Sequence, residues 1–331
     1  TWVLSEFEDL AARSGGTTTE QQPCDNKAYT GLLTQQDASI KCLASIGQQS
    51  PLVAAAASTS QIAIWDIVQR ERVQVLLGHS DVVSCLTCAA SFGRAASSAA
   101  LLISGSEDKS LKVWETSSGT NLRTMRGHHD AVWSVCCPND GQAPSASNNM
   151  SLVVSGSWDC TIRIWDFAAG ECRRVIKNAH RDGIWTLAFV GGLNSVRELQ
   201  QNATQQQSAQ HREDASFGQS GHVHVASGSW DKTVKVWDVT VDPPMAVHTL
   251  GDHNFSVTGL AALPGSNAFA STSEDRTIRI WNVLSGELKA TLQPSQGGHS
   301  DGIRCLVTMP DGVTIVSGGW DKRLVMWRVT P

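Results

Sequence analysis

The chain has 331 residues and a net charge of −5, from 26 basic and 31 acidic side chains spread along its length. A hydrophobic content of 41% is ample for a folded core, and no run approaches the ~20 apolar residues of a membrane-spanning helix. No block of lysine and arginine is present, which argues against general nucleic-acid binding. Nine cysteines, an odd number in a long chain, favour buried free thiols in a reducing compartment over a disulfide framework.

The chain begins with a segment that does not look like the rest. Residues 1–27 contain one strand-like run, 2–7, and we expect a partly irregular N-terminal extension. A second strand-like run follows at 28–33. From there to residue 331 the sequence repeats itself, so we expect residues 28–331 to form a single domain.

The repeat is marked by short alternating phrases that end on tryptophan. These phrases are QIAIWDI at 61–67, SLKVWET at 110–116, TIRIWDF at 161–167, TVKVWDV at 233–239, TIRIWNV at 277–283 and RLVMWRV at 323–329. The spacings between their tryptophans are 49, 51, 72, 44 and 46 residues. A period near this length, built from alternating apolar residues, is typical of a series of small β-sheets.

Residues 127–176 show what one repeat contains. Strand-like runs at 131–137, 152–157, 161–165 and 171–176 are separated by turn residues or polar loops. Four short antiparallel strands form one twisted sheet that cannot bury both of its faces alone. Sheets of this kind bury their faces by stacking around an axis.

In this repeat pattern the chain resembles the WD-repeat β-propeller family. The resemblance covers residues 28–331 and implies an all-β propeller with six recognisable four-stranded blades, or alternatively seven. The last repeat supplies only three strands, so the run at 28–33 is expected to close the ring as the fourth strand of that blade.

Five repeats carry histidine, serine, aspartate and tryptophan in register. The four sets are His79, His128, His180, His253 and His299; Ser104, Ser155, Ser227, Ser271 and Ser317; Asp108, Asp159, Asp231, Asp275 and Asp321; and Trp114, Trp165, Trp237, Trp281 and Trp327. Serine, histidine and aspartate can form a catalytic triad, but an enzyme needs one nucleophile, whereas a fold repeats its structural bonds. We therefore expect no enzyme activity. The resemblance implies a structural tetrad that joins the indole N–H through serine and histidine to aspartate.

The first repeat departs from this pattern. Gln36, Ala55 and Thr59 replace histidine, serine and aspartate, and only Trp65 remains. Packing alone should hold this blade together, so we expect it to be the least stable one.

Three repeats contain insertions between their first and second strands, at 91–99, 138–149 and 191–221. The last is glutamine-rich and of low complexity. The resemblance places all three on the bottom face of the propeller, where they are either tolerated loop growth or a second docking surface.

The remaining tryptophans supply the candidate binding site. Trp158, Trp230 and Trp320 precede the tetrad aspartate, a position held by Glu107 and Glu274 in two other repeats. Five residues after the tetrad histidine, or after Gln36 in the first repeat, stand Trp133, Trp185, Arg304 and Lys41. The resemblance places both positions on the top face, the side of the propeller that carries the turn aspartates. A tryptophan before the turn can instead pack between blades, but the grouping favours a site for a peptide of mixed character.

Motifs for other chemistry are absent from the sequence. No GxxxxGK[ST] loop occurs, and no GxGxxG opens a helix. Cys85 and Cys88 form a lone CxxC in a strand, which places their sulfurs on opposite faces. We expect no cofactor, no metal and no small-molecule substrate.

These features predict a non-enzymatic scaffold that binds one or more proteins on its top face within a multiprotein complex. The alternative is a structural subunit of a ribonucleoprotein or cytoskeletal particle, docked through the bottom-face loops and the N-terminal extension. In both cases we expect an intracellular protein, in the cytoplasm or alternatively the nucleus, without a membrane span or sequence-specific nucleic-acid contacts.

Overall fold

The computed structural model describes residues 39–47, 50–89, 100–138, 151–191 and 223–329. The chain divides into two units, 1–37 and 38–331, and every described residue belongs to the second. The expected extension at 1–27, the closing strand at 28–33 and nearly all of the three insertions lie outside the described residues.

The described residues form antiparallel sheets that follow one another along the chain as six blades. Blade 1 comprises β1 (Ile40–Ser45), β2 (Leu52–Ala57), β3 (Ile62–Asp66) and β4 (Glu71–Leu76). Blade 2 comprises β5 (Val83–Ala89), β6 (Leu101–Ser106), β7 (Ser110–Glu115) and β8 (Asn121–Arg126), and blade 3 comprises β9 (Val132–Cys136), β10 (Leu152–Ser157), β11 (Ile162–Asp166) and β12 (Glu171–Ile176). Blade 4 comprises β13 (Ile184–Gly191), β14 (His224–Ser229), β15 (Val234–Asp238) and β16 (Met245–Leu250), and blade 5 comprises β17 (Val257–Leu263), β18 (Ala268–Ser273), β19 (Ile278–Asn282) and β20 (Leu288–Leu292). Blade 6 comprises β21 (Ile303–Thr308), β22 (Thr314–Gly319) and β23 (Leu324–Arg328), preceded by the 3-10 helix η2 (Pro294–Gln296).

This architecture confirms the predicted six-blade, all-β propeller. In the third repeat, the expected strands at 152–157 and 171–176 coincide with β10 and β12. The other two expected strands correspond to β9 and β11 with ends that differ by one residue. Blade 6 has three strands among the described residues, as its sequence predicted.

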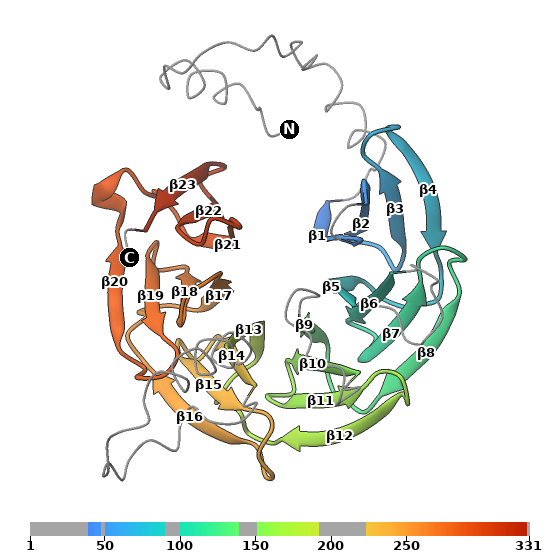
Figure 1. Ribbon diagram of the computed structural model, residues 1–331, viewed down its shortest axis with the longest axis horizontal. Helices are drawn as coiled ribbons and strands as arrows, with labels where there is room; N and C mark the ends of the chain where they lie inside the picture. Colours follow the sequence, from blue (N-terminus) through green and yellow to red (C-terminus); the bar gives the residue numbers. More distant parts are fainter. Residues whose placement is uncertain (1–38, 48–49, 90–99, 139–150, 192–222, 330–331) are drawn as a thin grey trace, which may run out of the picture. The chain divides into compact units, whose positions relative to one another are not determined.

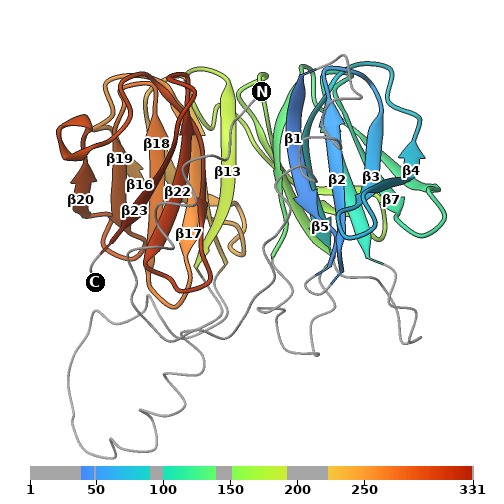
Figure 2. The ribbon, with the colours of Figure 1, turned by 90° about the horizontal axis from the view of Figure 1, so that it is seen from above.

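Each blade packs face to face on the next through its innermost strand. The innermost strands β1, β5, β9, β13, β17 and β21 contact one another in that order, as Figure 1 shows; Figure 2 shows β1, β5, β13 and β17 of this series from above. Side chains of the third strand in each blade point alternately to the two faces of the sheet, so they pack against both neighbouring blades. Ile162 and Ile164 pack toward blade 4, whereas Trp165 packs toward blade 2.

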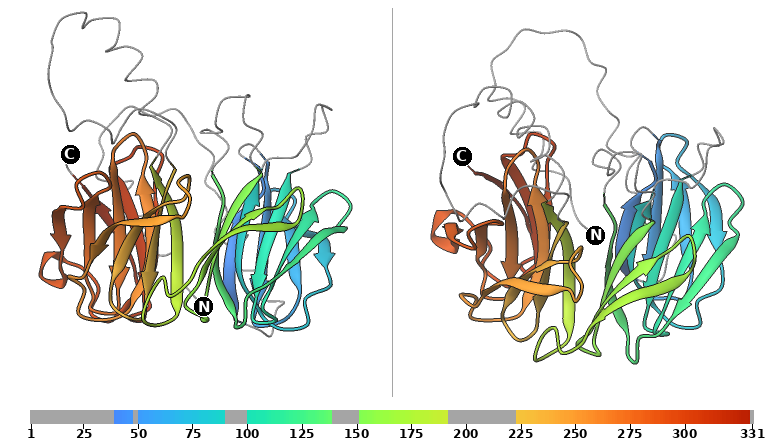
Figure 3. Two further views of the ribbon diagram at one scale, coloured as in Figure 1. Left: turned by 90° about the horizontal axis from the view of Figure 1, so that it is seen from below. Right: turned by 60° about the horizontal axis from the view of Figure 1, so that its bottom comes forward.

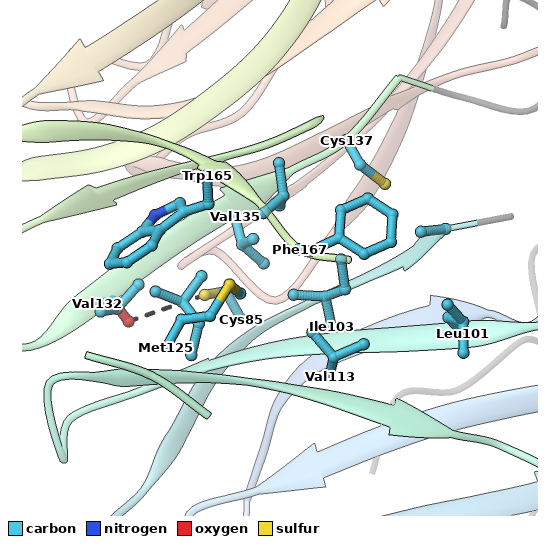
Figure 4. Packing of buried hydrophobic residues seen from close by; sticks show 13 residues of the cluster. Cys85, Leu101, Ile103, Val113, Met125, Val132, Val135, Cys137, Trp165 and Phe167 are labelled. Carbon is cyan, nitrogen blue, oxygen red and sulfur yellow. Dashed lines mark hydrogen bonds between the residues drawn. The ribbon is translucent and has the colours of Figure 1, made fainter. Parts of the chain in front are cut away.

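Figure 4 shows the core between blades 2 and 3. Ile103, Val113 and Met125 of blade 2 pack there against Val132 and Trp165 of blade 3. Close approach of the blades requires a small residue at certain strand positions. A Cβ at Gly156, for example, would lie 2.6 Å from Cγ2 of Ile184.

The series of blades is an open arc within residues 39–329. Figure 1 shows blade 6 and blade 1 at its two ends, with β21 and β1 across an opening from each other, and Figure 3 shows the blades from two further directions. Each end blade therefore packs against one described neighbour instead of two.

No helix in the described part of the chain is long and apolar enough to cross a membrane.

Candidate functional site

The predicted tetrad is a buried chain of hydrogen bonds, seen clearly in blade 3. The indole Nε1 of Trp165 donates to Ser155 Oγ at 2.8 Å, and Ser155 Oγ lies 2.7 Å from Nε2 of His128. Nδ1 of the same histidine lies 2.9 Å from Asp159 Oδ2. With the indole N–H as donor at one end and the carboxylate as acceptor at the other, one orientation of protons satisfies every member.

The same chain recurs in five blades. Tryptophan to serine distances are 2.8–2.9 Å, histidine to serine distances 2.7–2.9 Å and histidine Nδ1 to aspartate distances 2.7–3.0 Å. The tetrad serines are at most 1% exposed, so a substrate has no path to their hydroxyls. Five inaccessible copies support the structural interpretation of these residues.

The turn around each tetrad aspartate keeps its carboxylate ionised. Burial by itself would raise the pKa of Asp159, but hydrogen bonds from His128 and Thr161 outweigh it and hold the pKa well below its usual range. The backbone N–H of His129 donates to the same carboxylate. The pKa of each of the other four tetrad aspartates is lowered too, with hydrogen bonds again outweighing burial.

A second set of repeated serines supports this turn and was missed in the sequence. Ser157 Oγ donates to the backbone carbonyl of Asp130 and accepts from the backbone N–H of Asp159. Ser106, Ser229 and Ser273 make the equivalent bonds in their blades. The signal that would have found them is their spacing, two residues after four of the five tetrad serines; Gly319 holds this position in blade 6.

Blade 1 lacks the tetrad, as its sequence predicted. Ala55 is buried in place of serine, and Thr59 is exposed in place of aspartate. Trp65 is only partly buried, whereas the other five strand-ending tryptophans are at most 7% exposed. Gln36 lies outside the described residues.

The four tryptophans of blades 3 and 4 that do not end a third strand lie together, as expected. Ring centroids of Trp133 and Trp185 are 4.7 Å apart at 16°, which is a stacked arrangement. Trp158 meets Trp230 edge-on at 5.1 Å, and it also lies 6.1 Å from Trp133. We call these four residues, together with Arg304 and Trp320, the tryptophan cluster.

Arg304 links the tryptophans of blade 4 to blade 6. Its guanidinium carbon lies 4.8 Å from the ring centroid of Trp185 and 5.0 Å from that of Trp320, so the cation is held between two indoles. The intervening blade 5 carries the small Thr258 at the equivalent position. Burial lowers the pKa of Arg304, and the nearby charge of Glu274 opposes that effect.

Some cluster members also pack between blades, as the alternative interpretation proposed. A Cβ at Gly183 would lie 2.5 Å from Trp158 Cε3, so the indole lies directly on the backbone of blade 4. Trp133, Trp158 and Trp185 are half-buried. Trp230 and Trp320 are 42% and 58% exposed, which leaves apolar surface available to a partner.

Three of the nine expected site residues are not members of the cluster: Lys41, Glu107 and Glu274. The charge of Glu274 affects the pKa of Arg304, but no ion pair joins these two side chains among the described residues. Among the described residues, no ring contact or ion pair connects Lys41 or Glu107 to it. Lys41 is exposed on β1, and the backbone N–H of Glu107 bonds to Val82 in blade 2. The described residues also contain no group of three or more histidine, cysteine or acidic side chains placed to hold a metal ion.

The fold and its five tetrads define a WD-repeat propeller. The family described as WD domain, G-beta repeat matches residues 70–115, 119–166, 213–238, 245–282 and 286–328, which is more than half of the chain, and the chain belongs to this family. No match covers the third strand of blade 1, in keeping with its missing tetrad.

Curated relatives match most of the chain. It is 30% identical to nuclear distribution protein PAC1 of Arthroderma otae over 78% of this chain and 52% of that protein. It is 31% identical to nuclear distribution protein nudF of Aspergillus niger over 63% of this chain and 38% of that protein, and 25% identical to protein tipD of Dictyostelium discoideum over 92% and 41%. The chain spans about half the length of the first of these relatives.

Proposed function

We propose that this chain is a non-enzymatic intracellular scaffold that binds a protein partner through the tryptophan cluster. The observation that carries the proposal is the packing of five indoles and one guanidinium beside the starts of the inner strands and the adjoining turns of blades 3, 4 and 6. Tryptophan and arginine are enriched among the few residues that carry most of the binding energy of protein interfaces.

The charges around the cluster support a peptide of mixed character. No acidic side chain of the described residues lies within ion-pair distance of the Arg304 guanidinium, although the charge of Glu274 partly opposes the lowering of its pKa. Beside the cluster, Lys232 lies 5.7 Å from the ring centroid of Phe255, which is 57% exposed. A partner peptide that presents apolar side chains together with a carboxylate would match this surface.

The relatives support the class of the function. Proteins named nuclear distribution proteins match 78% and 63% of this chain, and propellers of one fold serve many processes by binding different partners. We propose a cytoplasmic adaptor in a multiprotein complex on this basis.

Replacing Trp133 and Trp185 together by alanine should weaken partner binding by about 30-fold or more, because a buried interface tryptophan contributes about 2 kcal/mol or more. The partner would first be isolated from the native cell with the wild-type chain, then purified and titrated against each variant. Circular dichroism should show a melting midpoint within a few degrees of the wild type, since both indoles are already half-buried rather than central to the core.

Met245→Ala is the matched control. This side chain is 57% exposed on the outermost strand of blade 4, away from the inner strands, and its loss should leave binding unchanged. Unchanged binding by the double variant, or a collapsed melt, would contradict the proposal. Deleting residues 195–218 separates it from the alternative of an assembly subunit docked by its loops, since the scaffold should still bind without them.

A further inference from the structure

The outer sheet face of blade 6 is apolar and open to solvent. Val307 of β21 is 54% exposed, and Leu324 and Met326 of β23 are 60% and 57% exposed. Leu324 and Met326 lie at alternate positions of β23, and strand pairing aligns Val307 with Val316 and Val316 with Met326, so the three side chains share one face of the sheet. Three neighbouring apolar side chains this exposed on one regular sheet are unusual for a protein surface.

The other five blades provide internal controls. The positions one and three residues before the strand-ending tryptophan are occupied in blade 6 by Met326 and Leu324. The equivalent residues are at most 2% exposed in every other blade: Ile62 and Ile64, Leu111 and Val113, Ile162 and Ile164, Val234 and Val236, and Ile278 and Ile280. In each of those blades the next blade along the chain covers this face.

Blade 1 presents the matching open face at the other end of the arc. Leu43 is 59% exposed, whereas the equivalent Leu187 and Leu260 of later blades are 6% and 8% exposed. Ile67, two residues after Trp65, is 50% exposed, and the equivalent Phe167 is 5% exposed. The arc therefore ends in two apolar faces that the fold covers everywhere else.

The edge and flanks of blade 6 add detail to what would fit. Its sheet has three strands among the described residues, so β23 is an edge strand open to β-pairing. Lys322, Arg323 and Arg328 flank the apolar side chains of β23 and are exposed. A segment that pairs here gains from acidic residues beside its apolar ones.

We propose that a second polypeptide inserts a β-sheet between blades 6 and 1, with alternating apolar side chains toward both faces and acidic residues at its ends. The inserted sheet would make the same kind of contact that each blade makes with its neighbour at the five interfaces between successive blades. Residues 1–38 lie outside the described residues, and the test below separates them from a second polypeptide. This inference concerns residues outside the tryptophan cluster and does not depend on the proposed function.

Site-specific photo-crosslinking tests the inference on the full chain in its native cell. A benzoylphenylalanine at position 326 should form an adduct with another polypeptide, while the same probe at position 245, on outer strand β16, should not. Mass spectrometry then maps the captured segment, which is made as a peptide and titrated against the purified protein. The inference requires that apolar residues alternate along this segment as in a β-strand. It also requires that the double variant Leu324→Asp and Met326→Asp binds the segment at least tenfold more weakly than the wild type.

The two aspartates should leave the melting midpoint of the protein alone unchanged, because both positions already face solvent. Met245→Asp, at a similarly exposed position, should leave binding unchanged. An adduct only with residues 1–38 of the same chain, an adduct only with a second copy, or no adduct at all would each overturn the inference. Retained affinity in the double aspartate variant would do so too.

Discussion

Replacing Asp159 by alanine should lower the free energy of unfolding by about 3 kcal/mol, because it removes the acceptor at the end of a buried polar chain. Nδ1 of His128, the backbone N–H of His129 and the N–H and hydroxyl of Thr161 all lose their hydrogen bond to this carboxylate at once. His128 is 6% exposed, so water cannot readily replace the carboxylate. Chemical denaturation followed by circular dichroism measures the loss.

Thr59→Ala is the control, because it makes the same kind of change at the equivalent position of blade 1. Thr59 is exposed, and its hydroxyl accepts one long bond from the backbone N–H of Gln61 at 3.4 Å. The cost should stay below about 1 kcal/mol. Equal losses in the two variants would show that the tetrad contributes nothing beyond an ordinary turn.

Acid should destabilise the protein strongly, and the melting midpoint should fall by about 10 °C or more between pH 7 and pH 3.5. The folded state lowers the pKa of all five tetrad aspartates, so their contribution is present above the unfolded value of about 3.9 and is lost as pH falls below it. Burial lowers the pKa of His128 despite its bond to Asp159. The contribution of this histidine is therefore present above pH about 6.5 and is lost as pH falls toward its folded pKa.

The Asp159→Asn variant checks the origin of this effect. It should melt lower than the wild type at pH 7 and lose less of its stability on acidification, since one of the five lowered carboxyl groups is gone. Scanning calorimetry at several pH values measures both quantities. A melting midpoint that stays flat from pH 7 to pH 3.5 would rule out ionised tetrads as a main source of stability.

The repeated parts of the molecule were predictable from sequence because each is specified locally and several times. The alternation in TIRIW and the turn after Trp158 predicted β11 within one residue of its ends. The fixed spacing from Trp165 identified Ser155 and Asp159. This spacing works because strand pairing places Ser155 opposite Arg163, two residues before Trp165, where its hydroxyl reaches the indole N–H. The same register predicted that Trp133, Trp158, Trp185 and Trp230 would meet.

Features that depend on neighbours further apart were not predictable in this way. Arg304 reaches Trp185 past a whole blade, and that contact depends on side-chain length across the inner strands. Lys41 and Glu107 occupy the expected repeat positions, but the only tryptophans of their blades among the described residues are the strand-ending Trp65 and Trp114. Leu324 and Met326 alternate just as Ile162 and Ile164 do, so their exposure follows from the missing neighbour and not from their own sequence.

The open arc has a consequence for how the molecule comes apart. In a linear array of repeats each unit depends on its nearest neighbours, and the terminal units fray first. Blades 1 and 6 are such terminal units, and blade 1 also lacks the hydrogen-bonded tetrad present in the other five. Amide exchange should therefore be fastest in β1–β4 and slowest in blades 3 and 4, so that unfolding travels inward from the ends.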